Sequence, residues 1–205
     1  MNHLRAIVKL LRGVLHIFKG LWIIRWRFPA WSETQRYAVV ETWAQRLLVL
    51  WGVTLVVRGT PPAGGPVLLV ANHISWLDIV VMHAARHCRF VSKADVKHWP
   101  VIGTLATASG TVFIERESRR DAMRVVHHMA EALDAGDVVA VFPEGTTGDG
   151  RALLPFHANL LQAAIATHAP VQPVALAFVD AASGQRSDAP VYVGNTTLLA
   201  SIWRT

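Results

Sequence analysis

Cysteine is almost absent from this chain, since Cys88 is the single one among 205 residues. An intrachain disulfide is therefore excluded, and a reducing cytoplasmic setting fits this composition. Cys88 lies beside an expected strand, so we interpret it as a buried or half-buried thiol and not as a nucleophile. The length predicts one domain with a sizeable core.

Two common catalytic and nucleotide-binding motifs are also missing. No Gly-x-Ser-x-Gly stretch occurs, which excludes a serine nucleophile elbow. The glycine-rich stretch 144–150 lacks the Gly-Lys-Ser/Thr of a P-loop, so we expect no binding of ATP or GTP. Internal repeats and low-complexity tracts are absent as well.

Acidic residues are missing from the first 27 positions, which hold six cations. The rest of the chain holds 14 cations and 14 acids, so the whole formal net charge of +6 comes from this segment. A nucleic-acid-binding protein usually carries its basic patch on the folded domain itself. The charge distribution therefore predicts no nucleic-acid partner.

The basic segment 4–24 lacks an uninterrupted apolar run. A signal peptide would end in a small-residue cleavage site, whereas residues 22–28 are bulky and basic. A spanning helix needs about 20 mostly apolar residues, and cations interrupt this stretch. We favour an amphipathic helix that lies in the membrane interface. A spanning helix, or a helix packed on the domain with a solvated basic face, are the alternatives.

Angular positions on a helix favour the interfacial interpretation. At about 100° per residue, the basic side chains fall within an arc of roughly 80°, and apolar side chains occupy the opposite side. That division suits the headgroup–acyl boundary of an anionic leaflet. The basic set is Arg5, Lys9, Arg12, His16 and Lys19, and the apolar set is Leu10, Val14, Ile17, Leu21 and Ile24.

A second helix is expected from Ser32, as its N-cap, to about Trp51, with Glu33 in its first turn. Its aromatic residues either anchor at the interface or pack within the protein. We therefore divide the chain into membrane-associated helices at 1–51 and a folded domain at 52–205.

From residue 53 onward, apolar strands alternate with helices. This alternation predicts an α/β fold, a single layered domain whose mixed, mostly parallel sheet is flanked by helices. Residues 180–190 are expected to form a polar surface loop, and 198–203 the start of a further helix. The expected strands are 53–57, 67–71, 89–92, 111–114, 138–142 and 171–178, and the expected helices are 75–86, 94–108 with breaks near Pro100 and Gly103, 119–135 and 157–167.

The stretch Asn-His-Ile-Ser-Trp-Leu-Asp at 72–78 directly follows an apolar run. On one regular helix His73 and Asp78 would lie about 140° apart, so they meet only if His73 precedes the helix and Asp78 points back from its first turn. A neutral His73 that is oriented by Asp78 would act as a general base. Asp78 also fits a capping box with Ser75, and the two roles are compatible.

Two later blocks place groups that bind anions at the ends of strands. Arg116 closes Phe-Ile-Glu-Arg, and its guanidinium suits a phosphate, although a surface position among neighbouring charges is the alternative. Lys93, at another strand end, is a second candidate. Phe-Pro-Glu-Gly-Thr at 142–146 follows a strand, and its loop is expected to present backbone N–H groups to an anion.

His83 and His87 lie four residues apart on an expected helix, a spacing that permits a metal ion. No third ligand accompanies them in the sequence. We therefore interpret them as exposed or packed histidines and expect no metal.

The order of these blocks resembles the glycerolipid acyltransferase family typified by 1-acylglycerol-3-phosphate acyltransferases. In that family a His-x4-Asp block, an Arg-bearing block, a Phe-Pro-Glu-Gly block and a Pro-containing strand, here 171–174, follow one another. The resemblance covers about residue 53 to the C-terminus. It implies catalytic roles for His73 and Asp78 and substrate binding by Arg116, Glu144, Gly145 and Thr146, to which Lys93 adds a second cation by its position.

The resemblance implies transfer of a fatty acyl group from acyl-CoA or acyl carrier protein to the hydroxyl of a lysolipid. The expected acceptor is 1-acylglycerol-3-phosphate, which would give phosphatidic acid. Many family members have Arg where Thr147 stands, so a non-phosphate lysolipid such as lyso-ornithine lipid is the alternative acceptor. A catalytically silent membrane-binding protein of the same fold is an alternative of another class.

We expect a peripheral or monotopic location at the cytoplasmic face of the cell membrane. The expected partners are membrane lipid, the lysolipid acceptor and the acyl donor, and no cofactor is expected beyond that donor. Because family members continue past the position of the helix at 198–203, we expect the C-terminus to be truncated.

Overall fold

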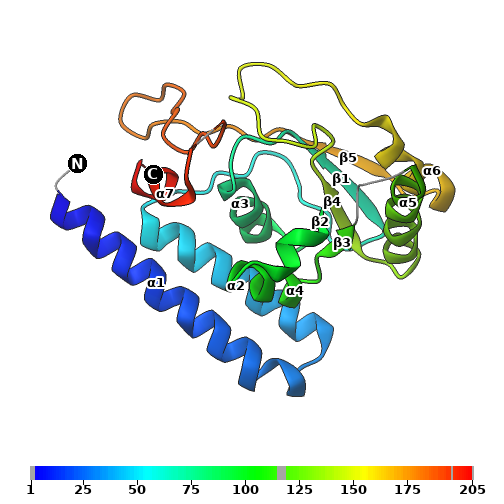
Figure 1. Ribbon diagram of the computed structural model, residues 1–205, viewed down its shortest axis with the longest axis horizontal. Helices are drawn as coiled ribbons and strands as arrows, with labels where there is room; N and C mark the ends of the chain where they lie inside the picture. Colours follow the sequence, from blue (N-terminus) through cyan, green and yellow to red (C-terminus); the bar gives the residue numbers. More distant parts are fainter. Residues whose placement is uncertain (1–2, 115–118, 195, 205) are drawn as a thin grey trace.

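The computed structural model describes residues 3–114, 119–194 and 196–204. Five strands form one sheet in the order β3-β2-β4-β1-β5, with helices on both faces (Figure 1). The α/β class is confirmed, but the expected mixed sheet is wrong, because every pairing among the described strands is parallel.

The strands are β1 (Val67–Ala71), β2 (Arg89–Lys93), β3 (Val112–Ile114), β4 (Val138–Val141) and β5 (Val171–Val174). The helices are α1 (His3–Trp26), η1 (Phe28–Ala30), α2 (Glu33–Trp51), α3 (Leu77–Ala85), η2 (Ala94–His98), α4 (Ile102–Ala108), α5 (Arg119–Asp134), η3 (Ala158–Leu161), α6 (Gln162–Thr167) and α7 (Leu198–Arg204).

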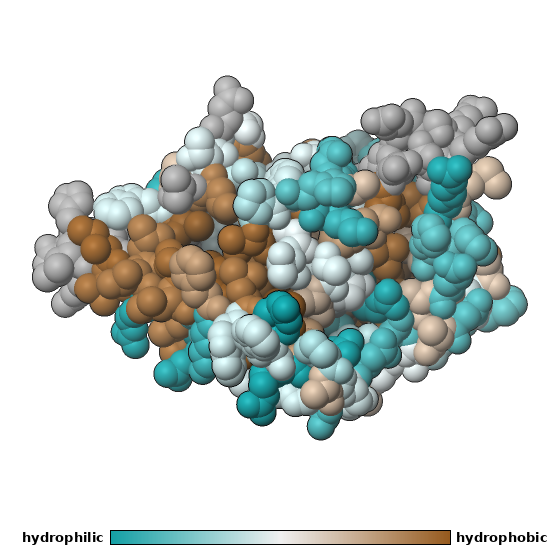
Figure 2. Space-filling model, turned by 60° about the horizontal axis from the view of Figure 1, so that its bottom comes forward, coloured by the Kyte–Doolittle hydropathy of each residue, from teal (hydrophilic) through white to brown (hydrophobic). Residues whose placement is uncertain are grey.

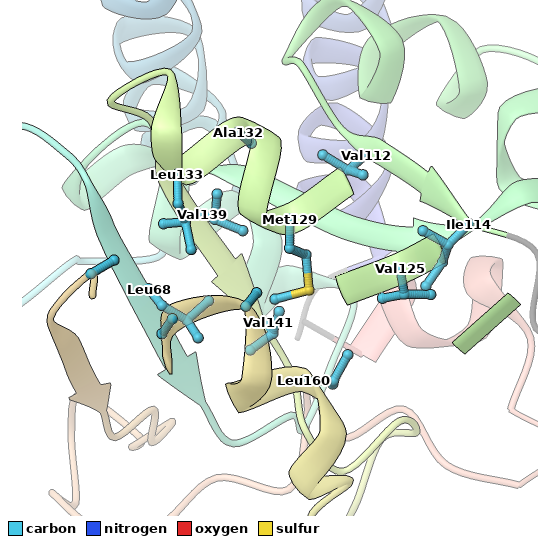
Figure 3. Close-up of a cluster of buried hydrophobic side chains, with 13 residues drawn as sticks. Leu68, Val112, Ile114, Val125, Met129, Ala132, Leu133, Val139, Val141 and Leu160 are labelled. Carbon is cyan, nitrogen blue, oxygen red and sulfur yellow. The ribbon is translucent and has the colours of Figure 1, made fainter. Parts of the chain in front are cut away.

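The central strands are buried on both faces, as a parallel sheet covered by helices requires. Leu68 packs with Met129, Leu133 and Val139 in the cluster under helices α5 and α6 (Figure 3). Its neighbour Leu69 belongs to a separate cluster of buried residues. Because adjacent side chains of a strand point to opposite faces, β1 helps to build two cores. Each fully buried leucine stabilises the fold by roughly 1.5–3 kcal/mol.

The segment 53–57 is not a strand, contrary to expectation. Val53 and Leu55 pack against a cluster of helical residues from α2 and α3, while Val56 and Val57 are exposed. Packing of an extended chain on helices therefore satisfies the alternating apolar pattern. The segment has no hydrogen-bonded neighbour among the described strands, so it does not join the sheet.

Strand β5 ends at Val174, four residues before its expected end. The backbone of Leu176 is held instead by the side chain of Asn72. The Asn72 Oδ1 accepts from the Leu176 N–H at 2.7 Å, and the Asn72 Nδ2 donates to the Leu176 carbonyl at 3.0 Å. This amide takes the place of a neighbouring strand and ties the chain after β5 to the loop after β1.

Helix α2 begins at the expected N-cap. The Ser32 Oγ accepts from the Gln35 N–H at 3.3 Å, and the Gln35 side chain accepts from the Ser32 N–H at 2.9 Å, which completes a capping box. The helix stops at Gly52, whose left-handed conformation (φ 73°) suits glycine. Leu47 and Leu48 bury this helix against α3.

Helix α1 turns an apolar face away from the rest of the molecule. Its inner face packs on α2, where Gly13 and Gly20 are buried and the His16 Nε2 donates to the Trp43 carbonyl at 3.0 Å. The apolar side chains of α1 that are more than half exposed, which we call the outward stripe, are Ile7, Leu11, Leu15, Phe18, Trp22 and Trp26.

The amphipathic helix is therefore present, but its most exposed apolar face differs from the expected one. Of the expected apolar set only Val14 is exposed, and Leu10, Ile17, Leu21 and Ile24 are half-buried. The difference arises because the glycines of α1 receive the rings of Trp43 and Trp51, which fixes the helix rotation. Within the described part of the chain, no helix combines the length and the apolarity that crossing a membrane requires.

Candidate active site

The carboxyl ends of β1, β2 and β4 meet at one edge of the sheet, because the strands are parallel. In open α/β sheets this edge is the usual place of a binding site. The loop 72–76 follows β1, the loop 142–150 follows β4, and Lys93 ends β2. The predicted ligand Arg116 lies outside the described residues.

His73 and Asp78 meet as the sequence predicts. The His73 Nδ1 lies 2.8 Å from the Asp78 Oδ2, and Asp78 is completely buried. His73 precedes helix α3, while Asp78 lies in its first turn. Because the carboxylate can only accept, we assign the proton to Nδ1, which leaves Nε2 unprotonated. The part of the chain that the structure describes offers Nε2 no hydrogen-bond partner.

The Asp78 carboxylate orients the imidazole, but the expected capping box with Ser75 is only half formed, because Trp76 is the N-cap of α3 and the Asp78 N–H donates to the Ser75 carbonyl instead of its hydroxyl. The Asp78 Oδ2 also accepts from the Ile74 N–H at 2.6 Å and from the Ser75 N–H at 2.8 Å. The Ser75 Oγ in turn accepts from the Leu77 N–H at 3.2 Å. One oxygen thus holds the turn before α3 and orients the imidazole, so the same turn fixes the position of the His73 ring.

The loop after β4 holds His73 from the other side. The imidazole stacks on the Phe142 ring, with 3.9 Å between ring centroids. The Glu144 Oε1 accepts from the His73 N–H at 2.8 Å, and the His73 carbonyl accepts from the Gly148 N–H at 2.7 Å. Sequence reasoning missed these contacts, since nothing in a linear pattern pairs residues about 70 positions apart.

Glu144 is buried, and both of its carboxylate oxygens are used. The second oxygen, Oε2, accepts from the Leu154 N–H at 2.9 Å. Glu144 therefore braces two backbone segments against each other. Its predicted role in substrate binding stays a prediction, which the ratio of effects on kcat and KM can test.

The other predicted substrate-binding residues lie at the same edge of the sheet. Gly145 has a left-handed backbone (φ 69°), and its N–H donates to the Phe142 carbonyl at 3.0 Å. Thr146 and Lys93 are exposed. The hydroxyl of Thr147, at the position where many family members have Arg, donates to the Tyr192 carbonyl. Their binding roles stay predictions.

His83 and His87 are packed histidines. Both are buried, and their rings lie 5.3 Å apart. Burial lowers the pKa of His83 to about 3 and that of His87 to about 4. The described residues contain no group of three or more side chains that could hold a metal ion. Cys88 is buried as expected, and burial raises the pKa of its thiol.

A hollow of about 300 Å³ opens at the opposite edge of the sheet. Arg89 and Val112, which line it, stand at the amino ends of β2 and β3. The hollow therefore lies away from His73 and is no part of the candidate site.

The chain resembles known proteins in sequence and in fold. The sequence profile of the acyltransferase family matches residues 54–177. The chain is 40% identical over 172 residues to a 1-acyl-sn-glycerol-3-phosphate acyltransferase of Neisseria meningitidis, covering 84% of this chain and 67% of that protein. It is 35% identical over 210 residues to a lyso-ornithine lipid O-acyltransferase of Pseudomonas aeruginosa, covering 100% of this chain and 80% of that protein.

A relative from Neisseria gonorrhoeae with the first of these names is 42% identical over 147 residues, which span 72% of this chain but 57% of that protein. The crystal structure of a 1-acyl-sn-glycerophosphate acyltransferase from Thermotoga maritima superposes with a TM-score of 0.66 over 83% of this chain and 71% of that one. At 23% identity this likeness supports the fold alone. The chain belongs to the acyltransferase family, as its motifs indicated, and is an acyltransferase.

Proposed function

We propose that this enzyme moves a fatty acyl group from a thioester carrier, acyl-CoA or acyl carrier protein, to the hydroxyl of a lysolipid. The observation that carries the proposal is the 2.8 Å contact between the His73 Nδ1 and the buried Asp78 Oδ2. A buried carboxylate stabilises the imidazolium that forms when Nε2 takes a proton, and it keeps the ring in the required tautomer.

The proposed reaction needs no enzyme-bound acyl intermediate. The His73 Nε2 takes the proton of the acceptor hydroxyl while that oxygen attacks the thioester carbon. The new ester C–O bond forms, the C–S bond breaks, and the departing thiolate takes the proton from the imidazolium. The absence of a Gly-x-Ser-x-Gly elbow fits this direct transfer.

The proposed acceptor is 1-acylglycerol-3-phosphate, with phosphatidic acid as the product. The names of the two Neisseria relatives support it. Lys93 is exposed at the edge of the sheet where His73 lies, which also supports an anionic headgroup. By family resemblance, Arg116 is the proposed ligand of the headgroup phosphate.

Lyso-ornithine lipid is the second candidate acceptor, and Thr147 favours it. A hydroxyl that donates to the Tyr192 carbonyl replaces the cation that many family members carry at this position. The Pseudomonas relative, which matches along the whole chain, is named for this acceptor.

The outward stripe of α1 is the proposed contact with the cytoplasmic leaflet. Figure 2 shows hydrophobic side chains gathered over the part of the surface where α1 lies, with hydrophilic side chains beside them. Exposed apolar residues flanked by cations suit the headgroup–acyl boundary of an anionic membrane. The enzyme is then a peripheral or monotopic protein that meets its lysolipid acceptor at the membrane surface.

The test is acyl transfer by purified protein in detergent. Labelled acyl-CoA and acyl carrier protein are each offered with lysophosphatidic acid and with lyso-ornithine lipid. We expect His73→Ala to lower turnover by about 10²–10⁴-fold, while His127→Ala, at an exposed histidine of α5, leaves it unchanged. If the His73→Ala variant turned over at the wild-type rate, the role of His73 as general base would be refuted. Product from lyso-ornithine lipid alone would select the second acceptor, and vesicle binding without any product would favour a catalytically silent protein.

A further inference from the structure

The segment between β2 and α4 contains a strained turn. Val101 adopts φ 65° and ψ −58°, and the Ile102 N–H donates to the Pro100 carbonyl at 2.7 Å. These values define a classic γ-turn, which is rare and strained. Positive φ is a genuine outlier for a β-branched residue, whereas glycine would adopt it freely. A valine at this position therefore costs backbone strain that a glycine would avoid.

The neighbouring backbone holds this turn in place. The Gly103 N–H donates to the Trp99 carbonyl at 2.9 Å. A Cβ atom on Gly103 would lie 2.1 Å from the Lys97 carbonyl oxygen, so only glycine permits this close approach. The turn is therefore a defined structure, and it leaves the side chains of Trp99 and Val101 52% and 38% exposed.

The surroundings of the 99–101 turn match those of α1. Helix α4, which follows the turn directly, packs against α1, so the turn lies beside the helix that carries the outward stripe. Lys93, Lys97 and His98 are exposed around the turn, with Asp95 as the acid among them. Exposed apolar side chains flanked by cations thus recur on a second segment, about 75 residues away in the sequence from the end of α1.

We propose that the 99–101 turn inserts Trp99 and Val101 into the same anionic lipid leaflet as the outward stripe, as a second membrane contact. This inference rests on the membrane location proposed above. Tryptophan with nearby lysine is typical of the membrane–water interface. Because the segment starts at Lys93, at the edge of the sheet where His73 lies, the second contact holds this edge against the leaflet.

A fluorescent probe on an introduced cysteine tests the insertion. Cys88 is buried and its thiol pKa is raised, so the native cysteine stays unlabelled in the folded protein. The labelled variants are Trp99→Cys, Phe18→Cys in the outward stripe, and Ile165→Cys on α6, which lies far from α1 in Figure 1.

On vesicles of phosphatidylglycerol and phosphatidylethanolamine, we expect blue-shifted emission from the probes at 99 and 18 and none from the probe at 165. A shift at 18 without one at 99 would overturn the second contact and leave the membrane location of α1 standing. No shift at either position would overturn both. A shift at all three would mean unspecific adsorption and would also overturn the proposal.

Substitutions provide an independent test. We expect Trp99→Ala to weaken vesicle binding by about tenfold, whereas Ile165→Ala leaves it unchanged. Val101→Gly removes an apolar side chain, so we expect weaker vesicle binding. It also relieves the positive φ, so we expect an unfolding temperature that is equal or higher. Unchanged vesicle binding by both Trp99→Ala and Val101→Gly would overturn the proposal.

Discussion

At the residue scale, His73 is held both at its ring and at its backbone. Its ring is held by Asp78 and Phe142, and its backbone by Glu144 and Gly148. Four contacts, one from helix α3 and three from the loop after β4, leave His73 little freedom to move. In the proposed reaction, a His73 ring that is already fixed costs little conformational entropy to order when the transition state forms.

Asp78→Asn tests the carboxylate. The amide can still accept from the neighbouring N–H groups, but it carries no charge to stabilise the imidazolium. We expect kcat to fall by about 10²–10⁴-fold. We also expect the free energy of unfolding to fall by about 1–3 kcal/mol, because the buried Oδ1 has no partner within the described part of the chain and an NH₂ there would be unsatisfied. Near-normal kcat with intact folding would contradict the orienting role.

Glu144→Gln separates positioning from substrate binding. A glutamine has one accepting oxygen where the carboxylate uses two, so one of the bonds to His73 and Leu154 is lost. We expect kcat to fall roughly tenfold with little change in the KM of the acceptor, and Glu144→Ala to be more severe. A raised acceptor KM with unchanged kcat would instead establish the substrate-binding role predicted from the sequence.

At the scale of elements, two glycines set the rotation of α1. A Cβ atom on Gly20 would lie 2.7 Å from the Trp43 Nε1, and one on Gly13 would lie 2.6 Å from the Trp51 Nε1. The Trp43 ring has little room to yield, because its Nε1–H donates to the His16 carbonyl at 3.2 Å. The close approach of these helices is what leaves the outward stripe unpaired.

Gly20→Ala tests this packing. Overpacking against the Trp43 ring costs about 1–3 kcal/mol, and the better helix propensity of alanine offsets up to about 1 kcal/mol of it. We expect a lower midpoint of urea unfolding. Gly64→Ala is the matched control, since nothing lies within 4 Å of the added methyl group. Equal midpoints for the two variants would contradict the role of the glycine.

At the scale of the whole molecule, buried histidines lie where α2 packs against the end of α3 and the segment before β2. The His87 ring stacks on Tyr37 of α2 with 3.8 Å between centroids, and the His87 N–H donates to Glu41 at 2.7 Å. His83 packs beside it, and its buried Nδ1 has no hydrogen-bond partner among the residues that the structure describes. Protonation of either ring inside this contact is unfavourable, which is why burial lowers both pKa values.

The protein should therefore lose stability in mild acid. The unfolded chain takes up protons at these histidines below their ordinary pKa of 6.5, whereas the folded state does so only near pH 4 and pH 3. Stability is then full above about pH 6.5 and falls as the pH drops, by roughly 2 kcal/mol per histidine at pH 5. We expect His83→Leu to flatten this dependence in urea unfolding and His127→Leu, at an exposed position, to leave it unchanged. An equally steep dependence in His83→Leu would contradict the assignment.

Local patterns predicted much of the fold and part of the site. The capping residue Ser32, the apolar strands and the meeting of His73 with Asp78 all follow from interactions within about five residues, so the sequence alone suffices for them. The predicted strand at 53–57 failed because its apolar alternation fits packing on helices as well as pairing in a sheet.

The sequence by itself determined the class of the protein, the order of its elements from residue 67 onward, the pairing of His73 with Asp78 and the excess of positive charge on α1. Each of these depends on neighbouring residues or on the order of motifs. Only the tertiary structure decided the all-parallel sheet, the bracing of His73 by Glu144 and the exposure of the outward stripe. These features depend on which distant segments pack together, and side-chain volumes and backbone hydrogen bonds settle that only when the chain is folded.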